Sequence, residues 1–165
     1  MQALEGFEIK QDEKILIYGI GNVGRQDDGI AIRLVEQLEA SLVGTPFFAQ
    51  ITFESNYQLG IEDALLLSDF DVVFFVDATK ESQALSPFSI RRLLPSHELA
   101  FTTHAMSFST ILSICDELYG RTPKTFLITV PGYEWGISET MSDAAKLNLK
   151  QTVNGITAGM EGAYA

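Results

Sequence analysis

A glycine-rich turn that directly follows an apolar run constrains this chain more than any other feature. Residues 14–18 are predicted to form a buried strand, and residues 19–24 then carry the pattern G-x-G-x-x-G. This pattern can hold a dinucleotide pyrophosphate at the start of the next helix. Asp27 and Asp28 argue against a phosphate, because like charges about 5 Å apart repel by roughly 3 kcal/mol at an effective dielectric constant near 20. The same geometry favours a cation or the polarised centre of a hydrolytic reaction.

After this turn, segments whose apolar residues are spaced as in a strand alternate with segments whose apolar residues are spaced as in a helix. Residues 72–76 are apolar at every position, as expected of a strand buried on both faces of a parallel sheet. Residues 87–94 are predicted to form an edge strand, because two adjacent arginines lie in it. The other predicted strands cover residues 14–18, 47–54 and 125–130, and the predicted helices cover residues 28–42, 61–70, 104–118 and 138 onward. This alternation predicts a doubly wound α/β sheet.

Length, charge and cysteine content limit the class of protein. The 165 residues are expected to form a single domain, 1–165, with a polar leader at 1–13 and a frayed tail at 160–165. The formal net charge of -11 disfavours nucleic acid and anionic membranes as partners. No apolar stretch reaches the roughly 18 residues that span a bilayer, and the leader lacks the pattern of a secretory signal. Because Cys115 is the only cysteine, there is no disulfide framework, and we expect a cytoplasmic monomer.

Three polar side chains are predicted to meet at the carboxyl ends of the strands, where open α/β sheets gather their functional groups. Asp28 follows the first strand across the glycine turn, Asp77 directly ends the strand at 72–76, and His104 opens a helix. Two carboxylates and one imidazole can ligate a divalent metal ion and still leave positions open for water or substrate. The sequence therefore predicts a metal site at this edge.

Each of these residues also has a purely structural explanation. Either member of the pair Asp27 and Asp28 could be the N-cap of the first helix, a role that stabilises by about 1 kcal/mol. Asp77 could be a turn residue, although a carboxylate beside a fully apolar strand loses hydration and needs a partner. His104 could simply begin a helix. Elsewhere we expect His97 to be solvated and the thiol of Cys115 to be buried. The aromatic side chains of Tyr133 and Trp135 are expected to pack in a loop.

With these residues assembled, the chain resembles the maturation endopeptidases of [NiFe] hydrogenases, which trim a C-terminal extension from the hydrogenase large subunit after nickel insertion. The resemblance rests on the glycine turn leading to Asp27-Asp28-Gly29, on Val76-Asp77-Ala78 and on His104. Residues 21–28, 56–59 and 132–135 resemble the branch that serves cytoplasmic, bidirectional-type hydrogenases. Two positions depart from that branch, which more often has proline and glycine there: Val23 and Ala31.

The resemblance implies a three-layer α/β/α sandwich around a twisted, mostly parallel sheet and an aspartic-type endopeptidase. Its substrate would be the nickel-loaded large-subunit precursor. Asp28, Asp77 and His104 would be both the catalytic residues and the ligands of nickel, which is sensed on the substrate rather than permanently bound. An unmetallated precursor would then bind poorly. The attacking water could be activated by Asp28 or Asp77, or polarised by the metal.

Two functions of other classes are alternatives. A nucleotide-binding module would use the glycine turn, but Glu54 at the end of the second strand lies about 30 residues past the turn, where the dinucleotide pattern expects roughly 20. A non-catalytic metallochaperone would carry nickel on the same three ligands, and only a peptidase would release a peptide. A serine or cysteine nucleophile is disfavoured, because the chain has no G-x-S-x-G turn and Cys115 is predicted to be buried.

Overall fold

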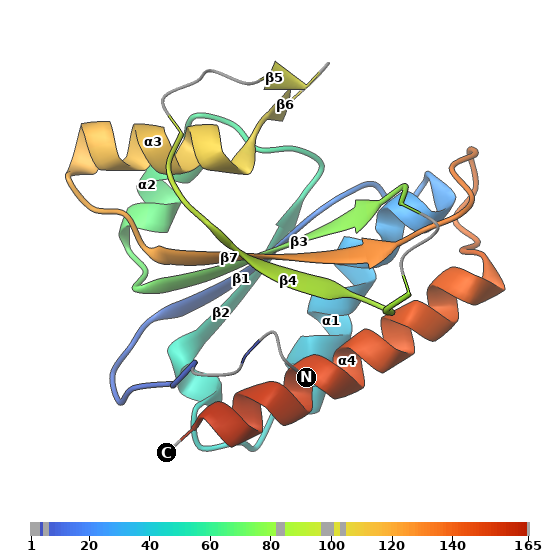
Figure 1. The fold of residues 1–165 in the computed structure, drawn as a ribbon, viewed down its shortest axis with the longest axis horizontal. Helices are drawn as coiled ribbons and strands as arrows, with labels where there is room; N and C mark the ends of the chain where they lie inside the picture. Colours follow the sequence, from blue (N-terminus) through green and yellow to red (C-terminus); the bar gives the residue numbers. More distant parts are fainter. Residues whose placement is uncertain (1–3, 5–6, 82–84, 97–100, 103–104, 165) are drawn as a thin grey trace.

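The computed structural model describes residues 4, 7–81, 85–96, 101–102 and 105–164, and within them five strands form one sheet (Figure 1). These strands are β1 (Ile15–Ile20), β2 (Ile51–Asn56), β3 (Val72–Thr79), β4 (Ser89–Leu93) and β7 (Lys124–Pro131). They lie in the order β2-β1-β3-β7-β4, and all neighbours are parallel except β7 and β4. Because β4 lies at the end of this order, the prediction of an edge strand at residues 87–94 is confirmed.

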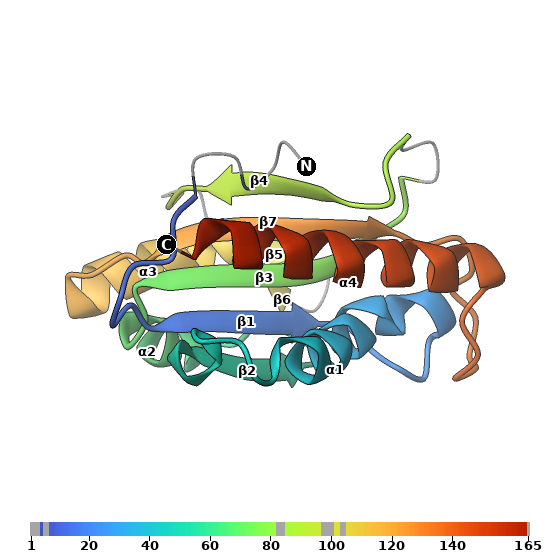
Figure 2. The ribbon, with the colours of Figure 1, turned by 90° about the horizontal axis from the view of Figure 1, so that it is seen from below.

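Helices cover both faces of the sheet. α1 (Ile30–Leu42) and α4 (Asp143–Ala163) pack against each other on one face, as Figure 2 shows with the sheet seen edge-on. α2 (Asp63–Ser68) and α3 (Phe108–Tyr119) pack together on the other face (Figure 1). This arrangement confirms the three-layer α/β/α sandwich. No helix in the described part of the chain combines the length and the apolar character needed to cross a bilayer.

The two faces of the central strands supply two separate core clusters. Along β1, Ile15 and Ile17 pack under α1 and α4, whereas Leu16 and Tyr18 pack under α2 and α3. Side chains in a strand alternate between its faces, so a strand covered on both sides must be apolar throughout. The same holds for β3, whose first five residues are all buried. The uninterrupted apolar runs in the sequence therefore follow from the helices on both faces.

Several element boundaries differ from the sequence-based prediction. A 3-10 helix, η2 (Gln26–Gly29), precedes α1, and neither helix has a side-chain cap, so the N-cap prediction for Asp27 or Asp28 is wrong. A second 3-10 helix, η3 (Phe48–Gln50), occupies part of the segment expected to be strand, and β2 begins only at Ile51. β3 continues to Thr79, so Asp77 lies inside the strand rather than after it.

Both long C-terminal helices begin later than predicted, each at a serine cap. The hydroxyl of Ser107 accepts a hydrogen bond from the Thr110 amide at 3.1 Å, and α3 begins at the next residue instead of near His104. A short pair of strands, β5 (Phe101–Thr102) and β6 (Ala105–Met106), comes before it. The hydroxyl of Ser142 likewise accepts from the Ala145 amide at 3.2 Å, so α4 does not begin at residue 138.

The ends of the chain pack more closely than predicted. Leu4, Phe7 and Ile9 are buried in the core, and the Phe7 ring meets the ring of Phe74 edge-on at 5.4 Å between centroids. The described part of this segment is therefore no polar leader, because these three side chains belong to the core cluster under α1 and α4. At the other end α4 runs to Ala163 with Met160 buried, so the described C-terminal residues are not frayed.

Candidate active site at the carboxyl edge of the sheet

The glycine turn after β1 is shaped by close contact between backbones. A Cβ atom at Gly21 would lie 2.1 Å from the carbonyl oxygen of Asp28, and one at Gly19 would lie 2.7 Å from that of Ala31. Only glycine leaves room for this approach. The amides of four residues in and beside the turn already donate to protein oxygen atoms, namely Gly21, Asn22, Gly24 and Arg25. These amides are not available to a pyrophosphate, so the turn does not have the character of a nucleotide loop.

Asp27 is fully buried and joins two distant loops. Its carboxylate accepts hydrogen bonds from the amides of Tyr133 and Glu134, at 2.7 and 2.9 Å, and from the amide and hydroxyl of Ser142, at 2.8 and 2.7 Å. Burial alone would raise the pKa of Asp27, but these hydrogen bonds outweigh it and hold the pKa below its usual value. The loop after β7 is thereby fixed against η2, and the two lie side by side in Figure 1.

Asp28 takes no part in these four hydrogen bonds and is only half-buried. Its carboxylate accepts one hydrogen bond, from the Asn22 amide at 3.0 Å. Burial raises the pKa of Asp28 above its usual value, although that hydrogen bond and the positive charges of Arg25 and Lys80 act in the opposite direction. Adjacent aspartates thus have different roles: Asp27 holds the loops together, and Asp28 presents a carboxylate at the edge of the sheet.

Asp77 lies on β3, opposite Ile20 of β1 and Thr129 of β7 in the strand registers. Burial, followed by the negative charge of Asp28, raises the pKa of Asp77 to about 7, against a smaller opposing effect from a hydrogen bond to the Ala78 amide. The two carboxylates are therefore close enough to repel each other. The strand register and this repulsion place Asp77 near Asp28 at the carboxyl edge.

His104 and His97 both lie outside the described residues. Among the residues that are described, no three His, Cys, Asp or Glu side chains gather into a metal-binding group. Of the three residues predicted to ligate a metal, the structure describes Asp28 and Asp77. Cys115 is buried, as predicted, and burial raises the pKa of its thiol, which does not suit a nucleophile.

Sequence reasoning missed the groups that surround the two carboxylates. Lys80, three residues after Asp77, lies with its Nζ atom 5.3 Å from the centroid of the Trp135 ring. Gln26 accepts from the Gly136 amide at 2.7 Å and so fixes the loop that carries Trp135. The serine cap at Ser142 was a signal that could have been found, whereas the contact between Lys80 and Trp135 joins residues without any sequence pattern.

Two small pockets flank the carboxylates along the edge of the sheet. One, of about 220 Å³, lies at the ends of β1 and β2 and includes Gly21 and Asn56. The other, of about 260 Å³, lies at the ends of β3 and β7 and includes Thr79 and Pro131. In the strand order, Asp28 and Asp77 come between them.

No protein-family model matches the sequence, and no curated protein matches it. Solved structures do match. The [NiFe] hydrogenase maturation protease HycI from Thermococcus kodakarensis superposes with a TM-score of 0.70 at 24% identity, over 90% of this chain and 93% of that one. The chain has the maturation-protease fold.

Two further solved structures agree with this assignment of the fold. The hydrogenase maturating endopeptidase HybD from E. coli gives a TM-score of 0.65 at 18% identity, over 91% of this chain and 93% of that one. The hydrogenase 2 maturation peptidase from a Thaumarchaeota archaeon gives 0.64 at 20% identity, over 92% and 99%. The resemblance seen in the sequence is therefore confirmed at the level of the fold.

Proposed function

We propose that this chain is an endopeptidase that removes the C-terminal extension of the nickel-loaded large-subunit precursor of a [NiFe] hydrogenase. The observation that carries the proposal is the pairing of Asp28 with Asp77 at the carboxyl edge of this fold. The three solved structures described above are named as hydrogenase maturation proteases, peptidases or endopeptidases. A carboxylate pair at the functional edge of that fold suits the same chemistry.

Nickel, as cargo of the substrate, suits this donor set. Two carboxylates that repel each other are relieved by a divalent cation placed beside both of them. Asp28 and Asp77 would be two ligands, and His104 is proposed as the third from the sequence resemblance. Because three side chains leave coordination positions unfilled, nickel would be held well only when the precursor supplies the remaining ligands. Binding would then depend on nickel having been inserted.

Asp77 is the proposed general base. Without metal the pKa of Asp77 is raised to about 7, and nickel beside it would lower that pKa and keep Asp77 as a carboxylate, the form that accepts a proton from water. Asp77 would take a proton from water as its oxygen attacks the scissile carbonyl carbon, and would return it to the amine nitrogen as the C–N bond breaks. The peptide would cross the edge of the sheet through the two flanking pockets.

The finer parts of the proposal follow from the same features. We infer an aspartic-type protease, since the described part of the edge offers carboxylates and the thiol of Cys115 is buried. We infer a monomer that works in the cytoplasm, because its substrate would be a precursor still being assembled. Residues 56–59 and 132–135 lie on the loops around the site and favour a bidirectional-type hydrogenase as the source of that substrate.

The test is release of the C-terminal peptide, measured by mass spectrometry after incubation with the nickel-loaded precursor encoded in the same genome. We expect cleavage by the wild-type protein and none by Asp77→Asn or His104→Ala. Asp69→Asn, a matched change at an exposed aspartate, and His97→Ala should both cleave normally. Nickel binding without peptide release would instead indicate a metallochaperone, and full processing by His104→Ala would remove this histidine from the site.

A further inference from the structure

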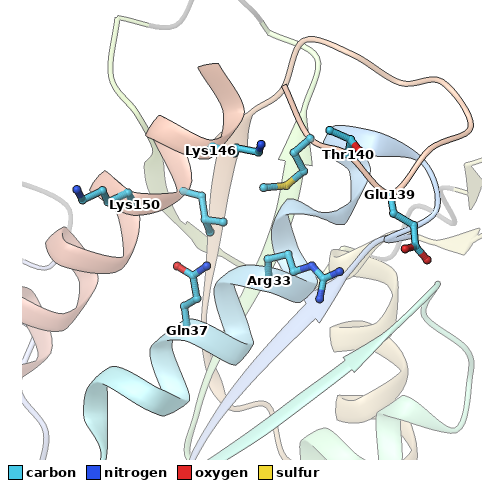
Figure 3. Close-up of a pocket in the computed structure, with 8 residues that line it drawn as sticks. Arg33, Gln37, Glu139, Thr140, Lys146 and Lys150 are labelled. Carbon is cyan, nitrogen blue, oxygen red and sulfur yellow. The ribbon is translucent and has the colours of Figure 1, made fainter. Parts of the chain in front are cut away.

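A second site lies away from the carboxylate pair, between α1, α4 and the loop that precedes α4. It is a pocket of about 610 Å³. Arg33 of α1 lies across it from Lys146 of α4, with Glu139 of the loop at one end, and Lys150, one turn further along α4, extends away from Arg33 (Figure 3). The wall between the two lysines is formed by Leu149, which is buried, and Met141 of the loop contributes a half-buried side chain.

The charge of this pocket is opposite to that of the molecule. The chain has a net charge of -11 and contains eleven lysine and arginine residues. Three of them line the pocket together with one carboxylate, Glu139, while the carboxylates that pair with Arg33 and Lys146 lie outside the lining, at the surface. An apolar wall beneath a cationic rim fits a peptide that carries both acidic and apolar side chains better than it fits a free anion.

These cations do not lie where they would stabilise the fold. Lys146 lies in the first turn of α4, where the helix dipole disfavours a positive charge, whereas the last turn of α4 has no basic residue. Its one ion-pair partner, Asp143, is fully exposed and 4.0 Å away. Arg33 pairs with Glu36 at 3.2 Å, also at the surface. Exposed pairs of this kind exchange readily with an incoming carboxylate.

The wall of the pocket is coupled to the candidate active site. The side-chain amide of Gln26 donates to the carbonyl oxygen of Thr140 at 3.3 Å, next to Met141. Ser142, at the end of the same loop, is bound to Asp27. Both Gln26 and Asp27 belong to η2, the element that carries Asp28. A chain bound in the pocket would therefore be held at a fixed position relative to that carboxylate.

We propose that this pocket docks an acidic, partly apolar segment of the protein that the enzyme processes. That the partner is the hydrogenase precursor rests on the function proposed above, whereas the preference for an acidic peptide rests on the pocket alone. The segment lies away from the scissile bond, so the pocket contributes to binding and not to the chemical step.

The test compares two double variants with the same change in net charge. Lys146→Glu/Lys150→Glu reverses the rim, and Lys10→Glu/Arg91→Glu reverses two exposed cations elsewhere. The probe is a short fluorescein-labelled peptide of glutamate and leucine, followed by fluorescence anisotropy. The rim variant should bind it about tenfold or more weakly than the wild-type protein, as when repulsion replaces attraction across an interface. The control variant should bind normally, and added salt should weaken wild-type binding.

Equal binding of the peptide by the three proteins would overturn the docking site, and so would equal binding of a matching lysine and leucine peptide. Lys146→Glu places a negative charge where the helix dipole favours it, so the rim variant should remain folded. With the precursor, the rim variant should show a raised KM and an unchanged kcat. If the wild-type protein cleaves no precursor, the proposed function fails, while the peptide measurements still decide whether the docking site exists.

Discussion

At the scale of single residues, neighbouring aspartates have opposite environments. Asp27 accepts four hydrogen bonds and its pKa is low, whereas Asp28 accepts one and its pKa is raised. Asp77 is more perturbed than either. A carboxylate that is satisfied by donors stabilises the fold, and one that lacks them is available for a ligand or a proton. The isosteric changes Asp77→Asn and Asp27→Asn should therefore have opposite effects on the free energy of unfolding.

Asp77→Asn should stabilise the protein at alkaline pH while abolishing processing. In the folded state the pKa of Asp77 is about 7, against 3.8 as its ordinary value, so the folded protein retains a proton that the unfolded chain has released. The contribution of Asp77 to wild-type stability therefore falls as pH rises from about 4 to 7. At about 1.4 kcal/mol per pKa unit, the neutral amide should raise the free energy of unfolding by up to about 4 kcal/mol at alkaline pH.

Urea unfolding with a chelator present checks this expectation, at one pH below and one above the pKa of Asp77. The gain from Asp77→Asn should be larger at the higher pH, and the exposed control Asp69→Asn should show no such difference. A variant that is less stable than the wild-type protein at alkaline pH would show that Asp77 is a structural residue.

Asp27→Asn should have the opposite effect on stability. An amide at this position offers one acceptor oxygen where the carboxylate offers two, so partly buried donors of Tyr133, Glu134 or Ser142 lose their partner. Each unsatisfied buried donor costs about 1–3 kcal/mol, and we expect a loss of at least about 2 kcal/mol. The midpoint of urea unfolding measures it. An unchanged midpoint would mean that the loop after β7 does not depend on Asp27.

At the scale of elements, the glycine turn should not tolerate a side chain. A methyl group at Gly21 would overlap the Asp28 carbonyl oxygen, so Gly21→Ala must displace η2 and should lower the free energy of unfolding by about 2 kcal/mol or more. Gly162→Ala is the matched control, because nothing lies within 4 Å of its Cβ position inside α4. That change should stabilise by up to about 1 kcal/mol. Thermal unfolding of both variants measures the contrast, and equal midpoints would contradict it.

The elements themselves were largely predictable from the sequence, because each central strand is covered on both faces and each helix has one apolar face. The edge strand was predictable from its arginines. The 3-10 helices were not, since η2 is shaped by contacts with the loop that follows β7. Sequence analysis placed the starts of α3 and α4 too early, although Ser107 and Ser142 are ordinary cap signals.

The candidate site was predictable only in part. The positions of Asp28 and Asp77 follow from the topology, because parallel strands end at the same edge. The separate roles of Asp27 and Asp28 do not, since the donors that distinguish them are 106 and 115 residues further along the chain. Periodicity reports which face of an element is buried, but it carries no information on contacts between loops so far apart.

At the scale of the whole molecule, the proposed peptide cleavage depends on nickel bound to the substrate. The nickel-loaded precursor should be cut and the nickel-free precursor spared, because the carboxylates of Asp28 and Asp77 repel each other until a cation lies between them. Asp28→Ala should lose this discrimination together with activity. Mass spectrometry of both precursor forms gives the measurement, and equal cleavage of the two would refute nickel sensing even if the chain is a peptidase.

The bridge made by Asp27 also sets the order of events during synthesis on the ribosome. The strands β1, β2 and β3 and the glycine turn emerge first, but the donors that fix η2 arrive only with Tyr133, Glu134 and Ser142. Contacts of such large sequence separation form late in folding. A nascent chain therefore carries Asp27 and Asp28 well before it can fix η2 in place, and the proposed proteolytic activity would begin only once Ser142 has left the exit tunnel.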